Sequence, residues 1–233
     1  MPQNTREHTP HANRLLAALP KNEYQHLLSN LEQVPLTFGT TLHKPGEIIR
    51  HVYFPIGGIA SLLATAGNGA TLEVGMVGRE GMIGVSAFMG VNTSRERAVV
   101  QGEGSAWRMK TALFRRACND GGRLPQLLQR YTHSLLTQLS QVAVCNRFHP
   151  IDARLARWLL MTGDRMGAND FRMTQEFLSN MLGVRREGVN KAAGNLQRKK
   201  LIHYSRGALA ILKRAGLEAL ACQCYRIIKD EYD

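Results

Sequence analysis

The sequence has little of what marks several common classes of protein. Aromatic residues make up 6% of its 233 residues, and four scattered cysteines form neither a disulfide framework nor a sequence-local zinc motif. No run approaches the roughly 18 to 20 apolar residues of a membrane span, and the polar N-terminus has no signal-peptide core. We therefore expect a cytoplasmic protein with no membrane partner, no bound metal and no cofactor known in advance.

Acidic residues are also scarce, so that positive charge dominates. The chain has 30 Lys and Arg against 18 Asp and Glu, a formal charge of +12. Ten of the basic residues lie between Arg172 and Arg214, where Glu176 and Glu187 are the only acidic ones. An apolar content of 44% is enough to form a core, which excludes a disordered chain. The basic segment is therefore either a solvated face or a surface that binds a polyanion.

The first part of the chain changes from a helical to a strand-like pattern. Leucines at three- and four-residue spacing predict two short helices between residues 13 and 33. Short apolar runs follow as far as residue 108, and turn signals cut them about every dozen residues, which favours an antiparallel β-barrel or jelly roll. We assign residues 1–123 to this domain. The turn signals are Pro45-Gly46, Gly57-Gly58, Gly67-Asn68-Gly69 and Gly102-Glu103-Gly104.

A long helix is predicted over residues 124–149. Pro125 suits its first turn, and His149-Pro150 ends it. Apolar residues recur along it at the spacing of a coiled-coil seam, which fits either a dimer of two long helices or a helix packed in its own domain. We assign the seam to a homodimer. Its residues are Leu128, Tyr131, Leu135, Leu139 and Val142.

Residues 150–233 begin with an amphipathic helix that contains Leu155, Trp158, Leu159 and Leu160, and they continue with a helix-turn-helix pattern. Thr174 can cap a short helix, Gly183 supplies the turn, and a second helix starts near Arg185. The inner face of this second helix is apolar: Val189, Ala192, Ala193 and Leu196. Its outer face carries polar and charged groups, as a recognition helix in the major groove requires.

A two-stranded hairpin is predicted directly after the second helix. The runs 201–204 and 208–212 flank the turn Ser205-Arg206-Gly207, so that a basic tip lies beside the recognition helix. This hairpin fits a wing that touches a phosphate. The residues that we expect to contact double-stranded DNA are Thr174, Gln175, Arg185, Arg186, Glu187, Asn190, Lys191 and Arg206.

Together these elements resemble the Crp/Fnr family of bacterial transcription regulators. The resemblance extends from Asn13 onward and is strongest at Arg154-Leu155-Ala156 and over residues 184–191, VRREGVNK. It implies an α+β fold with a cyclic-nucleotide-binding-like barrel, a dimerisation helix and a winged helix-turn-helix. It also implies that Arg186 donates to guanine, Glu187 accepts from cytosine, and Lys191 reaches a base or phosphate. RNA polymerase is a further candidate partner.

The effector of the barrel is left open by the residues present. Family members that bind cyclic nucleotides have a Gly-Glu turn for the ribose and an Arg-Ser or Arg-Thr pair for the phosphate. The matching pocket residues here are Gly84, Val85, Ser86, Arg95 and Arg97. Valine accepts no hydrogen bond, and Glu96 beside the phosphate position repels an anion, so we expect an unidentified effector or a scaffold rather than cyclic AMP or GMP.

Other functions have less support from the residues. No cysteine precedes Cys118, which argues against the iron–sulfur clusters of some family members. We interpret Cys222 and Cys224 as ordinary small residues, and His133 and His149 as structural or surface groups rather than haem ligands. No nucleophile elbow, phosphate loop or metal spacing indicates an enzyme. A ligand-binding module with only non-specific nucleic-acid binding is the remaining alternative to a sequence-specific regulator.

Overall fold

A computed structural model describes residues 13–67 and 69–232 of the chain. Short helices α1 (Arg14–Ala17) and α2 (Lys21–Leu28) lead into a sheet of five strands. Buried Asn13 fixes this start, because its side chain accepts hydrogen bonds from the amides of Leu15 and Leu16 and donates to the carbonyls of Pro55 and Gly81. The N-terminal helices are therefore held directly against the sheet.

Every strand pair of this sheet is antiparallel, as predicted, with the order β1-β5-β3-β4 and β2 beside β5. The strands are β1 (Glu32–Leu36), β2 (Thr41–His43), β3 (His51–Thr65), β4 (Thr71–Val77) and β5 (Arg97–Lys110). Within the described residues the pairing does not close into a ring. A short 3₁₀ turn, η2 (Val85–Ala87), lies between β4 and β5, and α3 (Thr111–Asn119) follows the sheet.

Two of the predicted turns are instead parts of long strands. Gly58 lies inside β3 and Gly104 inside β5, where the register of the pair shifts. A Cβ on Gly58 would lie 2.4 Å from the carbonyl oxygen of Gly102, and one on Gly104 would lie 2.3 Å from the carbonyl carbon of Gly57. These glycines permit close backbone contact at β-bulges rather than chain reversal. The prediction at Gly67 to Gly69 is right, since β3 and β4 pair on either side of it; Asn68 lies outside the described residues.

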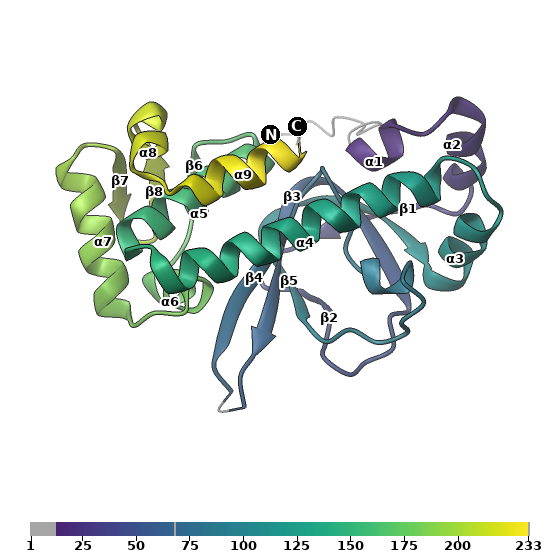
Figure 1. The fold of residues 1–233 in the computed structure, drawn as a ribbon, viewed down its shortest axis with the longest axis horizontal. Helices are drawn as coiled ribbons and strands as arrows, with labels where there is room; N and C mark the ends of the chain where they lie inside the picture. Colours follow the sequence, from purple (N-terminus) through teal and green to yellow (C-terminus); the bar gives the residue numbers. More distant parts are fainter. Residues whose placement is uncertain (1–12, 68, 233) are drawn as a thin grey trace, which may run out of the picture.

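The long helix α4 (Leu124–Phe148) has the predicted bounds, with a proline in its first turn and His149 as its C-terminal cap. It crosses the whole molecule, over the sheet and on to the C-terminal region (Figure 1). The C-terminal helix α9 (Gln223–Tyr232) lies beside it (Figure 1). Ser134 donates to the carbonyl of Glu231 at 3.0 Å, and Gln138 donates to the Tyr232 hydroxyl at 3.1 Å.

The apolar seam of α4, which the sequence pattern assigns to a dimer contact, is buried within its own chain. Leu128, Tyr131 and Leu135 belong to the core formed with the N-terminal helices and the sheet, Leu139 packs against that core, and Val142 is also buried. The chain itself covers this face. Helical periodicity shows which side of a helix is buried, but it does not show whether the covering surface belongs to the same chain.

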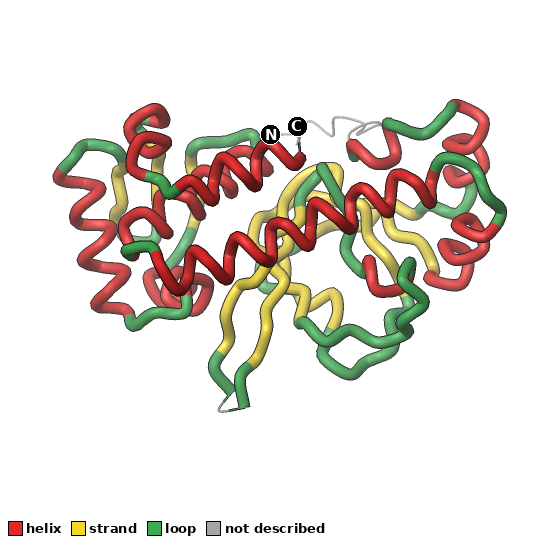
Figure 2. Tube along the Cα trace, in the orientation of Figure 1, coloured by secondary structure: helices red, strands yellow, loops and turns green. Residues whose placement is uncertain are grey.

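The C-terminal region consists of helices and a three-stranded sheet of order β6-β8-β7 (Figure 2). The predicted helix-turn-helix and wing are present, while the first strand of this sheet was not predicted. The elements are α5 (Ile151–Met166), β6 (Asp170–Arg172), α6 (Gln175–Leu182), α7 (Arg186–Arg198), β7 (Ile202–Ser205), β8 (Ala208–Ile211) and α8 (Arg214–Leu220). Among the described residues, no helix has both the length and the apolar character needed to cross a membrane.

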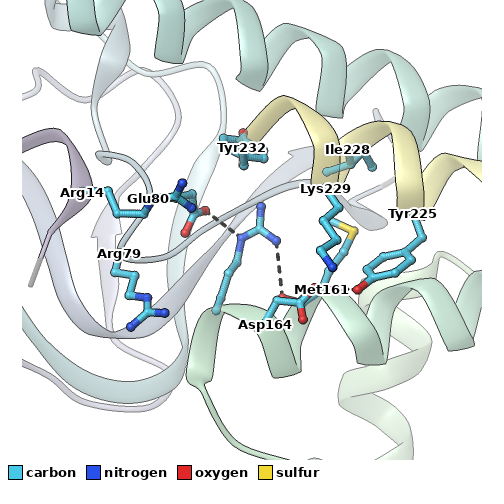
Figure 3. A pocket seen from close by; sticks show the side chains of 10 residues that line it. Arg14, Arg79, Glu80, Met161, Asp164, Tyr225, Ile228, Lys229 and Tyr232 are labelled. Carbon is cyan, nitrogen blue, oxygen red and sulfur yellow. Dashed lines mark hydrogen bonds and ion pairs between the residues drawn. The ribbon is translucent and has the colours of Figure 1, made fainter. Parts of the chain in front are cut away.

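Helix α5 connects the two parts of the protein. It was expected to be amphipathic, but it is buried continuously from Ala153 to Gly163, because the sheet covers one side and the C-terminal helices cover the others. Arg165 of α5 forms a buried ion pair with Glu80 of the N-terminal domain at 2.7 Å, and its guanidinium lies over the Tyr232 ring. The pocket in Figure 3 is lined from the N-terminal domain, α5 and α9 together.

A second polar contact between α5 and the sheet places a carboxylate in the core. The indole Nε1 of Trp158 donates to Glu73 at 2.8 Å, and the Ser61 hydroxyl donates to the other oxygen of Glu73 at 2.6 Å. Burial raises the pKa of Glu73 to about 7, although these hydrogen bonds and the nearby charge of Arg157 favour the ionised form. The folded protein therefore retains a proton on Glu73 at pH values where the unfolded chain has lost it.

We predict that Glu73→Gln makes the stability of the protein less dependent on pH. In the wild type, Glu73 favours folding most below pH 4.5, and this contribution is lost as pH rises through about 7. Relative to wild type, the variant should therefore gain up to about 3 kcal/mol in free energy of unfolding between pH 5 and pH 8. Urea unfolding at the two pH values measures the gain. The exposed Glu103→Gln variant is the control and should gain nothing; an equal difference at both pH values for Glu73→Gln would contradict the prediction.

Candidate nucleic-acid interface

The first helix of the motif, α6, is held by its own sequence at both ends. The hydroxyl of Thr174 accepts a hydrogen bond from the amide of Phe177 at 3.1 Å, and Glu176 lies in the first turn, as predicted. Gly183 ends the helix in the left-handed region at φ +60°. The turn to α7 therefore has a defined geometry.

The second helix, α7, has one buried and one exposed side, as the sequence predicts. Val189, Ala192, Ala193 and Leu196 are buried. The five residues of α7 and its start that were expected to contact DNA are all exposed: Arg185, Arg186, Glu187, Asn190 and Lys191. Arg185 is the N-terminal cap residue, but its side chain makes no capping hydrogen bond. The N-terminal end of α7 thus combines uncapped backbone amides with two arginines.

Polar contacts fix α7 to the elements on either side of it. Asn195 donates to the carboxylate of Asp152 in α5 at 2.8 Å, and Gln197 accepts from the amide of Tyr204 in β7 at 2.8 Å. The Tyr204 hydroxyl in turn donates to the carbonyl of Met173, just before α6. The helix-turn-helix and the hairpin therefore form one rigid unit. These positioning residues were not singled out from the sequence, because their partners are distant along the chain.

The hairpin tip brings a basic side chain next to the helix-turn-helix. Arg206 (φ +48°) and Gly207 (φ +81°) both have left-handed backbone conformations, as a two-residue turn of type I′ requires. One surface hollow is lined by Thr174, Gln175, Arg186, Arg206 and three neighbouring residues. Four of the expected DNA contacts from α6, α7 and the hairpin therefore lie around one concave surface.

The basic side chains of this surface are not neutralised by acidic partners. Among the described residues, no ion pair involves Arg185, Arg186, Lys191 or Arg206. Arg214, at the end of the basic segment, differs: it forms ion pairs with Asp164 at 2.5 Å and Glu218 at 2.9 Å. Arg214 thus stabilises the fold through its ion pairs. The cations of α7 and the wing are available to bind an external anion.

The helix-turn-helix also touches the N-terminal domain. The rings of Phe38 and Phe177 lie 5.6 Å apart, and a Cβ on Gly183 would lie 2.6 Å from a methyl carbon of Leu72 in β4. The turn between α6 and α7 is therefore in contact with the β3–β4 hairpin. A change in the N-terminal domain has a direct route to the motif.

The expected effector residues do not converge on one enclosed site. Gly84 begins the turn η2 at φ +95°, directly over His43, and Val85 and Ser86 are half-buried. Arg95 and Arg97 are exposed. Burial lowers the pKa of the His43 ring, which lies beside this turn. The sequence differs from cyclic-nucleotide-binding members of the family at these positions, and the exposure of Arg95 and Arg97 is consistent with that difference.

Four residues that sequence spacing did not connect lie together at the junction of α4, α5 and α9. The donor atoms of Cys145, His149, Cys222 and Cys224 all lie within 4.8 Å of one another. The hydrogen bond from Cys222 lowers the pKa of the Cys145 thiol, and the charge of Arg157 lowers it further. The same hydrogen bond raises the pKa of Cys222. In the sequence, only the spacing of Cys145 and His149 by about one helical turn pointed to this cluster. The other two members, Cys222 and Cys224, lie more than 70 residues further along the chain.

The sequence of this chain matches two known domain families. A model of the cyclic nucleotide-binding domain matches residues 33–120, and a model of the Crp-like helix-turn-helix domain matches residues 153–220. Both matched regions coincide with the sheet and the winged motif described above. The chain is thus a two-domain regulator with a nucleotide-binding-type fold and a DNA-binding motif. No curated protein matches the chain in sequence.

Solved structures have the same architecture over almost the full length. A protein assigned to the Crp/Fnr transcriptional regulators, from Eubacterium rectale, superposes with a TM-score of 0.70 at 18% identity, covering 91% of this chain and 98% of that one. FixK2 from Bradyrhizobium japonicum gives 0.70 at 15% identity, covering 82% and 98%. The c-di-GMP-responsive regulator CLP from Xanthomonas campestris gives 0.68 at 16% identity, covering 82% and 99%. The chain belongs to the Crp/Fnr family of transcription regulators.

We predict that Thr174→Ala destabilises the C-terminal region by about 1 kcal/mol, because an N-terminal amide of α6 loses its acceptor. Thermal unfolding without DNA measures this loss. Thr174→Ser retains a hydroxyl at the cap and should stay within a few tenths of a kcal/mol of wild type. Equal destabilisation by both variants would show that the hydroxyl does not cap the helix.

Proposed function

We propose that the protein is a homodimeric, sequence-specific DNA-binding regulator that places one α7 helix of each protomer in successive major grooves of a roughly palindromic operator. The observation that carries this proposal is the set of exposed cations without acidic partners on α7 and the wing. In this proposal the exposed Arg186 donates to a guanine, Glu187 accepts from a cytosine amino group, and Lys191 reaches a base or phosphate. Family membership sets the class of function.

The wing and the start of α7 suit the phosphate backbone. Arg206 lies at the tip of a hairpin whose conformation is fixed by its turn and by the contacts of Tyr204. The uncapped amides at the N-terminus of α7 favour an anion, and Arg185 adds a charge there. Contacts of this kind position the protein on DNA without reading sequence.

We propose that the exposed side of α4 forms the dimer contact. Leu136, Val144 and Phe148 are large apolar residues of α4 that are nevertheless 57%, 42% and 71% exposed. Pairing of two α4 helices through these residues would cover apolar surface that one chain leaves in water. This surface replaces the buried seam that was first assigned to the dimer.

The effector is proposed to be a molecule other than cyclic AMP or GMP, if the N-terminal domain senses a ligand at all. The Val85 side chain offers no acceptor for a ribose hydroxyl, and Arg95 and Arg97 are both exposed. Thermal shift and calorimetry with cyclic nucleotides test this point directly. Saturable stoichiometric binding of either nucleotide would overturn it.

We predict different effects for the loss of two arginines. Arg186→Ala should weaken binding to the operator by about 1 to 3 kcal/mol and relax the preference at one base pair, with little effect on random DNA. Arg206→Ala should weaken all sequences to a similar extent and lower the salt dependence by about one counterion. Fluorescence anisotropy over a range of salt concentrations, on a fragment selected from genomic DNA and on a shuffled one, measures both.

Arg116→Ala is the matched control, because Arg116 is an exposed arginine on α3, outside the DNA-binding region. It should change neither affinity nor salt dependence. If no genomic fragment binds more tightly than random DNA, the proposal of sequence-specific binding is overturned. If Arg186→Ala affects both DNAs equally, Arg186 has no role in reading bases.

We predict that Leu136→Glu shifts the dimer toward monomer, because it places a charge in the proposed contact of the two α4 helices. Sedimentation velocity should show at least about a tenfold weaker self-association, since burying an unpaired carboxylate costs well over 1.4 kcal/mol. Ile48→Glu changes an equally exposed apolar residue, 67% exposed, outside α4 and should leave the dimer intact. A dimer that tolerates Leu136→Glu must use another surface.

A further inference from the structure

The cluster formed by Cys145, His149, Cys222 and Cys224 is not used by the DNA-binding surface. Cys145 lies in the last turns of α4, and His149 caps that helix. Cys224 lies in the first turn of α9, and Cys222 directly precedes the helix. Three thiols and an imidazole, from two parts of the chain that are more than 70 residues apart, therefore meet where the long helix joins the C-terminal region.

The distances within this cluster fit a single tetrahedral metal ion. The sulfur atoms of Cys145 and Cys222 are 3.4 Å apart, and Nδ1 of His149 is 3.6 Å from the sulfur of Cys224. The edges of a tetrahedral zinc site with sulfur and nitrogen ligands are about 3.5 to 3.8 Å, given bond lengths of about 2.3 and 2.0 Å. The longest separation in the cluster, within 4.8 Å, exceeds such an edge by about 1 Å, so small side-chain rotations close the site.

The surroundings of the cluster favour anionic ligands. Cys145 and Cys224 are 0% and 2% exposed, and Arg157 donates from Nε to the sulfur of Cys145 at 3.3 Å. Arg157 is itself 3% exposed, and within the described residues its other hydrogen bond is to the sulfur of Met161. A buried guanidinium needs a nearby negative charge, and three thiolates on a divalent ion with one neutral imidazole carry a net charge of −1. Arg157 thus donates a hydrogen bond to a metal-ligating sulfur without binding the metal itself.

We propose that Cys145, His149, Cys222 and Cys224 bind one zinc ion, or an ion of similar softness and tetrahedral preference, as a structural Cys₃His site. Four protein ligands fill the coordination of zinc, so this site is structural rather than catalytic. The ion ties the end of α4 to the start of α9, across the bend at His149 and Pro150. It therefore fixes the angle between the long helix and the C-terminal region. The inference does not depend on the proposed function, because metal binding is measured without DNA.

The test is metal analysis of the full-length protein, purified under reducing conditions without chelator and dialysed against zinc-free buffer. Wild type should contain about one zinc per chain, and substitution with cobalt should give the strong visible bands of tetrahedral cobalt together with thiolate charge-transfer bands. Cys145→Ser and Cys224→Ser should bind zinc at least about 100-fold more weakly, since each loses a ligand rather than an outer partner. Cys118→Ser is the control, because Cys118 lies in α3 away from the cluster, and it should bind zinc like wild type.

The variant His149→Gln tests whether a loss of metal reflects the missing ligand rather than misfolding. His149 is only half-buried, so the variant should fold, and it should bind cobalt more weakly with a spectrum that has lost the imidazole contribution. Chelation should lower the melting temperature of wild type and Cys118→Ser by several degrees and leave Cys145→Ser unchanged.

Several results would overturn the proposal. They are a wild type that binds no zinc while all its thiols react freely, a six-coordinate cobalt spectrum, and full zinc retention by Cys145→Ser. Mass mapping under non-reducing conditions adds a further one: a disulfide between Cys145 and Cys222 in freshly purified protein that does not take up zinc after reduction. That outcome would assign the pair to redox chemistry instead.

Discussion

The burial of helix α5 is the constraint on which the rest of the structure depends. A helix buried on all sides must have a partner surface in every direction, and here the sheet, α7, α8 and α9 supply them. The core that surrounds it includes Ile59, Leu63 and Met76 from the sheet together with the inner faces of the helix-turn-helix. The sheet therefore contributes to the core of the DNA-binding region, in addition to the separate core that it forms with the N-terminal helices and α4.

The same helix carries three buried arginines, each with a different kind of partner. Arg165 pairs with Glu80, Arg154 donates to the carbonyl of Leu182, and Arg157 donates to the sulfur of Cys145. Buried charges are costly unless they are paired, so these contacts fix α5 relative to the loop after β4, to the helix-turn-helix and to the end of α4. The three arginines thus connect α5 to both the N-terminal domain and the helix-turn-helix.

The polar contacts also link the N-terminal domain to the DNA-binding motif. The turn after α6 lies on β4, and Glu73 of β4 accepts a hydrogen bond from Trp158 of α5. Anything that shifts β4 acts on both the motif and its supporting helix. Two arrangements of this contact with different affinity for an effector are what allosteric control would require.

The sequence by itself determined the local elements of this protein. Thr174, Gly183 and the Arg206-Gly207 turn define the winged helix-turn-helix, and Pro125 and Pro150 set the ends of the long helix, because caps, turns and proline act over a few residues. Only the tertiary structure decided which surface covers each apolar face. It buried the seam of α4 within its own chain, made Gly58 and Gly104 bulges instead of turns, and gathered Cys145 and Cys222 from opposite ends of the C-terminal half. The spacing of residues along the chain does not predict such contacts, since they depend on how remote segments pack.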